Sequence, residues 1–318
     1  MQLDQELQNI KSVAIAGHIR PDGDCVGSCL ATYNYIRTYN PTVDVRVFLE
    51  PIPTIFHFLQ GADRICDATS CDDVFELCIV LDCGDANRLG DAIKFFHSAE
   101  KTICIDHHVS NQAFAQKNKI VADASSASEL VYDTMDPDKV TKEIAECIYT
   151  GLIHDTGVFQ YGCTSSHTMQ IAGRLMDLGI DYPSIVDKTF YEKTYAQNKV
   201  MGQALLNSRL YEDAGCIASV ISQEEMHQFG VLPKHLDGIV SQLRITKEAD
   251  VAIFLYGLEP GSYKVSTRCK SDAVDLSKLA VKYHGGGHKK AAGFTVEGDD
   301  PWALIDGIVS DVKEQLMQ

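Results

Sequence analysis

The stretch GHIRPDGDCVGS at residues 17–28 decides the fold class of this 318-residue chain. It follows an apolar run at residues 13–16 that has the length of a strand, and it precedes a segment with the apolar spacing of a helix. His18, Asp22 and Asp24 therefore lie on a turn between a strand and a helix. Ligands of open α/β sheets bind at this edge of the sheet. An imidazole and two carboxylates on such a turn predict a site for a divalent metal ion.

Two further apolar runs in the first half of the chain are followed by residues of the types that can ligate metals. Residues 77–81 form a short, wholly apolar run that ends at Asp82, and residues 102–105 form another that ends at the Asp-His-His triplet 106–108. Such runs are typical of buried parallel strands, and they alternate here with helical segments. The pattern predicts an α/β fold with an N-terminal doubly wound, mostly parallel sheet.

The sequence pattern changes after a polar helical stretch in the middle of the chain. We predict a catalytic domain at residues 1–186, a helical linker at 187–211 and a smaller α/β domain at 212–318. Strands of the smaller domain are expected in its apolar runs, such as residues 251–256, and a terminal helix is expected from Pro301. We also expect a catalytic cleft between the two domains.

Composition limits the partners and the location of the protein. The formal net charge of −16 argues against binding to long duplex nucleic acid, which requires a basic surface. The polar N-terminus and the lack of an apolar segment of ~20 residues predict a cytoplasmic protein without membrane contact. The 11 cysteines are scattered and form no Cys-x-x-Cys pair, so we interpret most of them as reduced, buried fillers. A homodimer is compatible with the sequence.

The candidate ligands of the first half stand at strand ends or in loops, where one sheet edge can bring them together. Mixed nitrogen and oxygen donors favour Mn²⁺, with Mg²⁺, Co²⁺ or Fe²⁺ as alternatives. Six such residues could hold two divalent ions, which together activate a water and clamp the attacking and leaving oxygens of a phosphate ester. The residues in question are His18, Asp22, Asp24, Asp82, Asp106, His107, His108 and Asp155.

Each of these residues taken singly has a simpler explanation. An aspartate after a strand is most often a helix cap, and the Asp-Gly-Asp sequence after Pro21 lacks the ligand spacing of a calcium-binding EF-hand loop. The joint occurrence of four such clusters favours a metal site. A non-catalytic nucleotide or RNA sensor and a purely structural protein are the alternatives to an enzyme.

The motifs of the chain resemble those of the DHH phosphoesterase superfamily, in the same order. They are GHxxPDGDxxGS at residues 17–28, Asp82, DHH at residues 106–108 and GLxxDTG at residues 151–157. The sequence GGGHxxAAG at residues 285–293 resembles the signature of the DHHA1 domain. In its length, the chain resembles the proteins of the stand-alone, NrnA-like branch of this superfamily. These proteins combine oligoribonuclease and 3′-phosphoadenosine 5′-phosphate (pAp) phosphatase activities.

The resemblance implies a role for each candidate ligand. It implies a first metal held by His18 and Asp22, a second metal held by other residues, and Asp82 shared between the two. In the family, the residue at His108 points toward the scissile phosphate or the leaving group, and Asp106 would orient an imidazole. The second metal would be bound by Asp24, Asp82, His107 and Asp155.

Three glycines at residues 285–287 and the basic residues near them form the conspicuous basic cluster of this acidic chain. Consecutive glycines expose backbone N–H groups, so we predict an anion-binding loop; an ordinary flexible loop or a helix cap is the alternative. The resemblance implies that Arg268 and His288 hold the non-scissile phosphate, and that Gly286 and Gly287 contact it through the backbone.

These inferences lead to one functional hypothesis. The chain is predicted to be a manganese-dependent phosphodiesterase and phosphatase in which a metal-bridged hydroxide attacks phosphorus. Its expected substrates are short RNA, linear dinucleotides such as pApA, and pAp, which would yield nucleoside monophosphates, or AMP and phosphate. A RecJ-like exonuclease or a pyrophosphatase of the same superfamily is the closest alternative. The sequence leaves open whether Arg20 and Arg88 contact the substrate.

Overall fold

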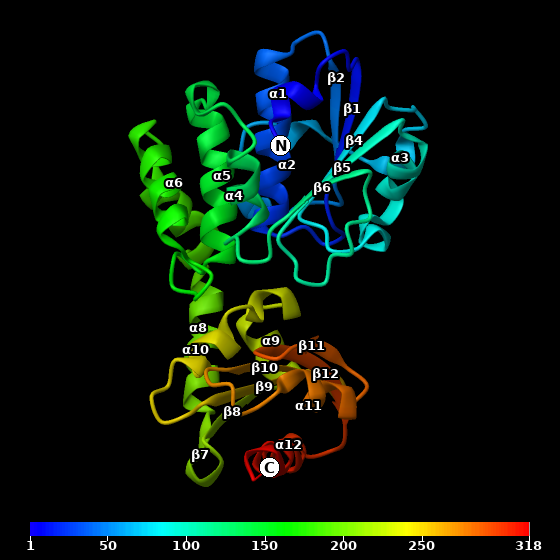
Figure 1. Cartoon of the computed structure of the whole chain (residues 1–318). Coiled ribbons are helices and arrows are strands. Elements are labelled where there is room, and N and C mark those ends of the chain that lie inside the picture. Colours follow the sequence, from blue (N-terminus) through cyan, green and yellow to red (C-terminus); the bar gives the residue numbers. More distant parts are fainter. Residues whose placement is uncertain (318) are drawn as a thin grey trace. The chain divides into compact units, whose positions relative to one another are not determined.

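A computed structural model of the chain describes residues 1–317, which divide into two compact units at residues 1–192 and from residue 193 onward. Each unit contains one six-stranded sheet with helices on both faces (Figure 1). The predicted fold class, a doubly wound α/β unit followed by a smaller α/β unit, is confirmed.

The sheet of the first unit has the strand order β3-β2-β1-β4-β5-β6, and all of its described pairings are parallel. The direction in which the chain adds strands reverses between β1 and β4, and ligands of doubly wound folds bind at such a reversal. The strands are β1 (Ser12–Ala16), β2 (Asp44–Phe48), β3 (Ile65–Cys66), β4 (Leu77–Leu81), β5 (Lys101–Asp106) and β6 (Lys117–Ile120).

Helices cover both faces of this sheet, because its central strands are apolar on both sides. In Figure 1, α2, α4, α5 and α6 lie on one side of the sheet and α3 lies on the other. On the α3 side, the rings of Phe48 and Phe95 stack with their centroids 4.1 Å apart. The helices are α1 (Leu3–Glu6), α2 (Gly23–Tyr39), α3 (Ile93–Ser98), α4 (Ala127–Tyr132), α5 (Lys142–Asp155), α6 (Ser166–Asp177) and α7 (Tyr182–Val186).

The second unit has a mixed sheet with the order β11-β12-β10-β9-β8-β7, in which only β8 and β9 pair in parallel among the described strands. Helices α11 and α12 supply one apolar core, and α8, α9 and α10 supply the other. The strands are β7 (Arg209–Tyr211), β8 (Cys216–Ile221), β9 (Val251–Glu259), β10 (Ser262–Cys269), β11 (Gly286–His288) and β12 (Ala291–Glu297). The helices are α8 (Tyr195–Leu206), α9 (Gln223–Phe229), α10 (Ile239–Arg244), α11 (Leu276–Lys282) and α12 (Pro301–Leu316).

The stretch predicted as a helical linker is not one continuous helix in the structure. A single π-helical turn at Asp187–Tyr191 ends before α8 begins at Tyr195. Thr194 separates the two, because its side-chain oxygen accepts a hydrogen bond from the backbone N–H of Gln197 and so caps the start of α8. The end of the predicted linker is strand β7.

Gly286 and Gly287 of the glycine run lie in a strand and not in the loop that the sequence predicts. Gly286 and Gly287 pair with Gly293 and Ala292 of β12 in an antiparallel hairpin. Close approach of the two backbones explains the need for glycine: a Cβ atom on Gly287 would lie 2.5 Å from the Ala292 Cα, and its φ of 146° is rare for other residues.

Candidate metal centre

The predicted ligands of the first unit gather at the carboxyl end of its sheet. His18 follows β1, Asp82 follows β4 and Asp106 ends β5, while Asp155 ends helix α5. Three neighbouring strands therefore deliver their terminal side chains to one edge, next to the point where the strand order reverses. At this edge, Asp82 lies between two histidines.

The Asp82 carboxylate faces His18 with one oxygen and His107 with the other. Its Oδ2 lies 3.4 Å from His18 Nε2, and its Oδ1 lies 3.6 Å from His107 Nε2. The backbone at Asp82 is left-handed, with φ of 51°, a conformation that aspartate and asparagine adopt more readily than most residues. This turn directs the carboxylate of a residue that is only 2% exposed between the two imidazoles.

On the first side of Asp82, His18 is held with Nε2 toward the carboxylates. Its Nδ1 hydrogen-bonds the backbone carbonyl of Ile19 at 2.8 Å, which fixes the ring, and its Nε2 lies 3.7 Å from Asp22 Oδ2. The other oxygen of Asp22 accepts hydrogen bonds from the N–H groups of Asp24 and Cys25 and so caps helix α2. Asp22 therefore both starts the helix and faces the centre.

On the second side, His107 lies among carboxylates from three elements. Its Nε2 is 3.0 Å from Asp155 Oδ2 and 3.9 Å from Asp24 Oδ2. Asp24 is completely buried, and its two oxygens accept hydrogen bonds from the backbone N–H groups of Ala127 at 2.6 Å and Ser128 at 2.9 Å. Those amides open helix α4, and their partial positive charge stabilises the carboxylate where it stands.

The donor atoms form three overlapping groups whose members lie within 4.8 Å of one another. Asp82 belongs to two of them, so it links the two sides of the centre. One group includes Cys25, whose sulfur lies within this distance of donor atoms of His18 and Asp82, whereas the sequence predicts that most of the cysteines are buried fillers. The groups are His18–Cys25–Asp82, Asp82–His107–His108 and Asp24–His107–Asp155.

The carboxylates of the centre stabilise positive charge on the neighbouring imidazoles. Burial disfavours a charge on His18, but Asp22 and Asp82 outweigh it and raise the pKa of His18 to about 11. Burial likewise opposes the charge on His107, yet Asp155 and Asp82 raise its pKa to about 12. For Asp82, burial is outweighed by His107 and His18, which hold its pKa well below its usual range. A divalent ion competes with protons for these same nitrogens.

These residues fit a divalent metal ion on physical grounds. Asp82 Oδ1 is buried and makes no hydrogen bond within residues 1–317, and such an unpaired oxygen is costly unless a cation or donor satisfies it. The surrounding donors are imidazole nitrogens and carboxylate oxygens, a mixture that suits Mn²⁺ and related ions. His18 and Asp22 lie on one side of Asp82, and Asp24, His107 and Asp155 on the other.

Asp106 orients His108, and Asp106 is itself held by Asn111, a residue that the sequence did not indicate. Its Nδ1 lies 2.7 Å from Asp106 Oδ1, and the other oxygen of Asp106 accepts a 2.7 Å hydrogen bond from Asn111. The Asp106 carboxylate raises the pKa of His108. Asn111 also donates to the carbonyl of Cys83, and no sequence pattern links it to this role. Asp106 and Asn111 thus fix the orientation of the His108 ring through its Nδ1.

We expect Asp106→Asn to lower kcat by roughly 10–100-fold with little change in metal content, because it weakens the support of His108 without removing a metal donor. Steady-state kinetics and metal analysis of the purified variant test this expectation. The exposed residue Asp138 provides the control Asp138→Asn, which should leave kcat at the wild-type value. Loss of metal in Asp106→Asn would contradict the supporting role.

The residues predicted to bind substrate lie on the sheet of the second unit. Arg268 of β10 and His288 of β11 both pair with Ala291 of β12, one from each side. Residues directly opposite each other in an antiparallel sheet share a face, so these two basic side chains belong to one row. Gly286 and Gly287 precede His288 in β11. The Arg268 side chain also donates to the carbonyl of Thr267.

The loop after β1 is fixed by two residues that the sequence left unassigned. The N–H of Arg20 donates to Glu50 Oε2 at 2.7 Å, and the carbonyl of Arg88 accepts a 2.7 Å hydrogen bond from the N–H of Ile19. Both backbones therefore help to position His18.

No helix within residues 1–317 is long and apolar enough to cross a membrane.

Comparison with known proteins gives the family of the chain. Residues 12–152 match the model of the DHH family, N-terminal domain, and residues 213–318 match that of the DHHA1 domain. The bifunctional oligoribonuclease and PAP phosphatase NrnA of Thermus thermophilus is 27% identical over 96% of this chain and 90% of its own length. The protein of the same name from Bacillus subtilis is 26% identical over 95% of this chain and 94% of its own length.

A solved structure supports the fold. The exopolyphosphatase-related protein of Bacteroides fragilis superposes with a TM-score of 0.88 at 24% identity, covering 99% of this chain and 96% of that one. The two matching domain models, in the order that the motifs predict, and the relatives that span nearly the whole chain agree with one another. This chain therefore belongs to the DHH phosphoesterase family, with a DHHA1 domain after its DHH domain.

Proposed function

We propose that this protein is a divalent-metal-dependent phosphoesterase that hydrolyses short oligoribonucleotides, linear dinucleotides such as pApA, and pAp. The observation that carries the proposal is the position of Asp82 between His18 and His107, with one carboxylate oxygen toward each. Relatives that are named oligoribonuclease and PAP phosphatase support the choice of substrate class.

Each side of Asp82 would hold one ion. His18 and Asp22 would complete the first site with Asp82, and the second site would use the donors around His107, with Mn²⁺ as the favoured ion. When bound, a pair of divalent ions activates water at neutral pH and offsets the charge of the phosphoryl group. The protein contributes the spacing, because buried backbone amides of α4 fix Asp24 and the left-handed turn fixes Asp82.

His108 would act on the leaving group. Asp106 holds its Nδ1 and favours the protonated ring, so Nε2 can give a proton to the oxygen that departs from phosphorus. The proton returns from solvent after product release, since the His108 side chain is about one-third exposed, at 31%. Arg268 and His288 would hold the phosphate that is not cut, because cationic and N–H donor groups in one row suit an anion.

A turnover panel tests the proposal. Protein loaded with Mn²⁺ would be incubated with pAp, pApA, pyrophosphate and RNAs of about two, five and twenty nucleotides. We expect pAp, pApA and the shorter RNAs to be hydrolysed, and the longest RNA to be cut slowly. Rapid hydrolysis of pyrophosphate with none of the nucleotides cut would instead favour a pyrophosphatase and contradict the proposal.

Arg268→Ala should raise the KM for pApA roughly tenfold or more while the metal content stays at the wild-type level, because the substitution removes a charge-assisted contact outside the metal centre. The matched control is Lys247→Ala, which removes an exposed positive charge elsewhere in the same unit. Steady-state kinetics and metal analysis give the two readouts. An unchanged KM would show that Arg268 does not bind the substrate.

A further inference from the structure

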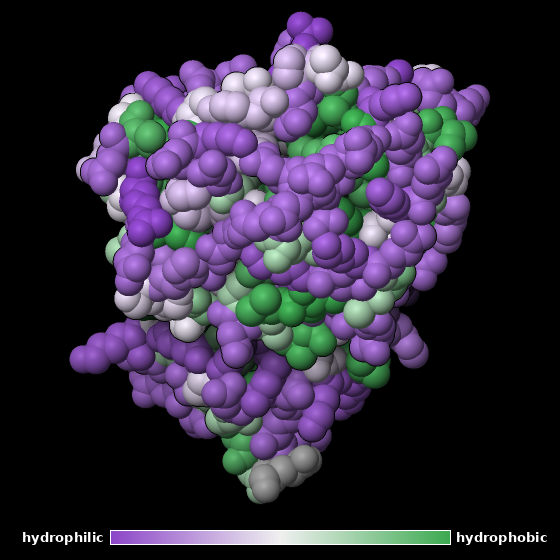
Figure 2. Space-filling view, turned by 45° about the horizontal axis from the view of Figure 1, so that its top comes forward, coloured by the Kyte–Doolittle hydropathy of each residue, from purple (hydrophilic) through white to green (hydrophobic). Residues whose placement is uncertain are grey.

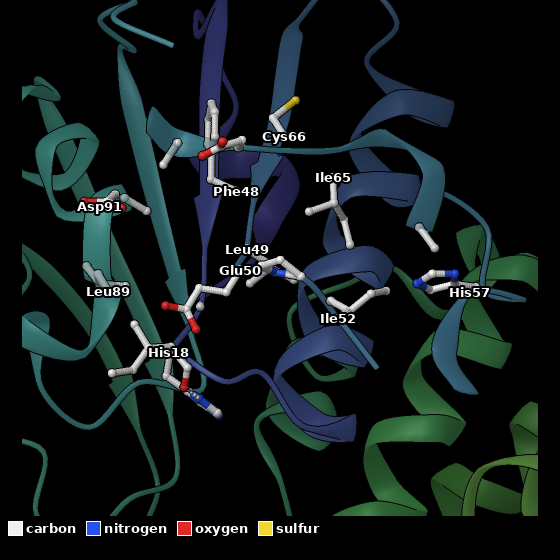
Figure 3. A pocket seen from close by; sticks show the side chains of 17 residues that line it. His18, Phe48, Leu49, Glu50, Ile52, His57, Ile65, Cys66, Leu89 and Asp91 are labelled. Carbon is white, nitrogen blue, oxygen red and sulfur yellow. Dashed lines mark hydrogen bonds between the residues drawn. The ribbon is translucent and has the colours of Figure 1, made fainter. Parts of the chain in front are cut away.

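A cavity of about 600 Å³ opens beside the metal centre in the first unit. It lies where β1 and β2 end, and the segment after β4 closes another side (Figure 3). Nothing in the proposed chemistry uses it, although His18 is part of its wall. A volume of this size accommodates a ring system as large as a nucleobase with its sugar.

The walls of the cavity are mainly apolar. Leu49 and Leu89 are almost fully buried, and Ile19, Ile52 and Ile65 are partly exposed toward the space. Figure 3 shows Leu89 and Ile52 on opposite sides of the cavity, with Leu49 between them. Flat apolar walls of this kind bind the faces of a planar ring and exclude water from them.

Three carboxylates line the cavity, together with the imidazoles of His18 and His57. Glu50, Asp67 and Asp91 line it, and none of the lining residues, all of which the structure describes, is a lysine or an arginine. A phosphate would be repelled, so the cavity does not bind the phosphoryl part of a substrate. Ionised carboxylates only accept hydrogen bonds, and they therefore select a group that presents N–H donors.

The Glu50 carboxylate can accept further hydrogen bonds. Glu50 uses Oε2 to accept from the N–H of Arg20, which holds the side chain in place and leaves Oε1 available. Glu50 and Asp91 lie on the same side of the cavity as Leu89, and Glu50 extends toward His18 (Figure 3). Glu50 is thus the acceptor nearest the metal centre, and Asp91 lies farther from His18 along the same wall (Figure 3).

His18 connects this cavity to the metal centre. Its Nε2 faces Asp82 at 3.4 Å, while the residue also lines the cavity. Because His18 belongs to both, the group next to a phosphate bound at the centre would lie on the side of the cavity. In a nucleotide, that neighbouring group is the nucleoside.

We propose that this cavity binds the nucleobase of the nucleotide whose phosphate is hydrolysed, and that Glu50 and Asp91 make it selective for guanine. The inference rests on the proposed phosphoesterase function. Guanine presents two adjacent N–H donors, at N1 and N2, that match a carboxylate, whereas adenine presents donors only at N6. The apolar walls contact the ring faces, and the negative charge keeps phosphates out.

The test compares pGpG with pApA as substrates. Wild-type protein should favour pGpG in kcat/KM by about tenfold. In the double variant Glu50→Gln/Asp91→Asn, which keeps side-chain size, this preference should fall to about twofold or less. The control Asp72→Asn removes the same charge from a side chain that is 98% exposed and pairs with Lys94, and it should keep the preference.

A second variant tests the cavity by volume. Ala68 lines the cavity and is partly exposed, so Ala68→Trp should fill the space and raise the KM for pGpG about tenfold, with the melting temperature reported alongside. An unchanged guanine preference in the double variant, or equal rates on the two dinucleotides in the wild type, would overturn the inference.

A base-free ester separates the inference from the proposed function. Bis(4-nitrophenyl) phosphate contains no nucleobase, so its Mn²⁺-dependent hydrolysis by the wild-type protein reports only on the phosphoesterase chemistry. Hydrolysis of this ester without any base preference among dinucleotides would reject the nucleobase site alone. Absence of hydrolysis of every ester would reject the proposed function itself.

Discussion

Asp82→Asn will reduce turnover of pApA at least about 1,000-fold and will lower the metal content of the protein. The substitution removes the negative charge that faces both His18 and His107, and the lost electrostatic stabilisation is worth several kcal/mol. Asparagine tolerates the left-handed backbone at this position, so we expect the fold to persist.

Two measurements check the Asp82→Asn prediction. Kinetics with saturating Mn²⁺ give the loss of turnover, and metal analysis after gel filtration gives the ions retained per chain. A thermal melt close to that of the apo wild-type protein would show that the variant is folded. Near-normal turnover in a folded Asp82→Asn variant would contradict the central role of this carboxylate.

Gly27→Ala will lower the free energy of unfolding by roughly 3 kcal/mol, at the upper end of ordinary overpacking effects. Helices α2 and α5 cross so closely here that an added Cβ would lie 2.5 Å from the Cys147 carbonyl oxygen and 2.9 Å from the Gly151 nitrogen. Backbone atoms cannot move aside as a flexible side chain can. The helices must separate, and Asp24, one turn earlier in α2, would move with them.

Gly173→Ala is the matched control for this prediction. Gly173 lies in helix α6, and a Cβ there would meet no atom of the described residues within 4 Å. Because alanine favours helix more than glycine does, this variant should be more stable by roughly 0.5–1 kcal/mol. Urea unfolding of both variants gives the comparison. Equal stability of Gly27→Ala and wild type would show that the helices are less tightly packed than the structure indicates.

Much of the first unit could be predicted from sequence because its signals are local. The apolar runs before Asp82 and Asp106 have strand length, and parallel strands place their carboxyl ends at one edge. The fold class and the family resemblance are confirmed by the structure and by the matching domain models. The individual metal-ligand assignments stay predictions, although the structure brings those side chains together.

Features that depend on distant contacts could not be predicted. The run Gly286–His288 pairs with β12, and only the close approach of that strand shows why glycine is needed. Asn111 supports Asp106 through one hydrogen bond that no motif signals. The amide of Ala127 that holds Asp24 comes from 103 residues away along the chain, and sequence alone indicates only that a helix starts there.

A protein that binds nucleic acid usually has a basic surface, whereas this chain is acidic. Figure 2 shows a mainly hydrophilic face with several green, hydrophobic groups among the polar side chains. Because the chain has a formal net charge of −16, it repels long polyanions on average. We therefore propose that bound metal and local residues such as Arg268 supply the positive charge at the substrate. This agrees with the proposed preference for short substrates.

The most direct test of the central claim is a titration of the metal-free protein with Mn²⁺ in which ion binding and pApA hydrolysis are measured on the same samples. We expect two bound ions per chain, with turnover appearing only as both sites fill, since Asp82 belongs to the donor groups on both sides of the centre. Full turnover by metal-free protein, or full turnover with a single ion bound, would contradict it.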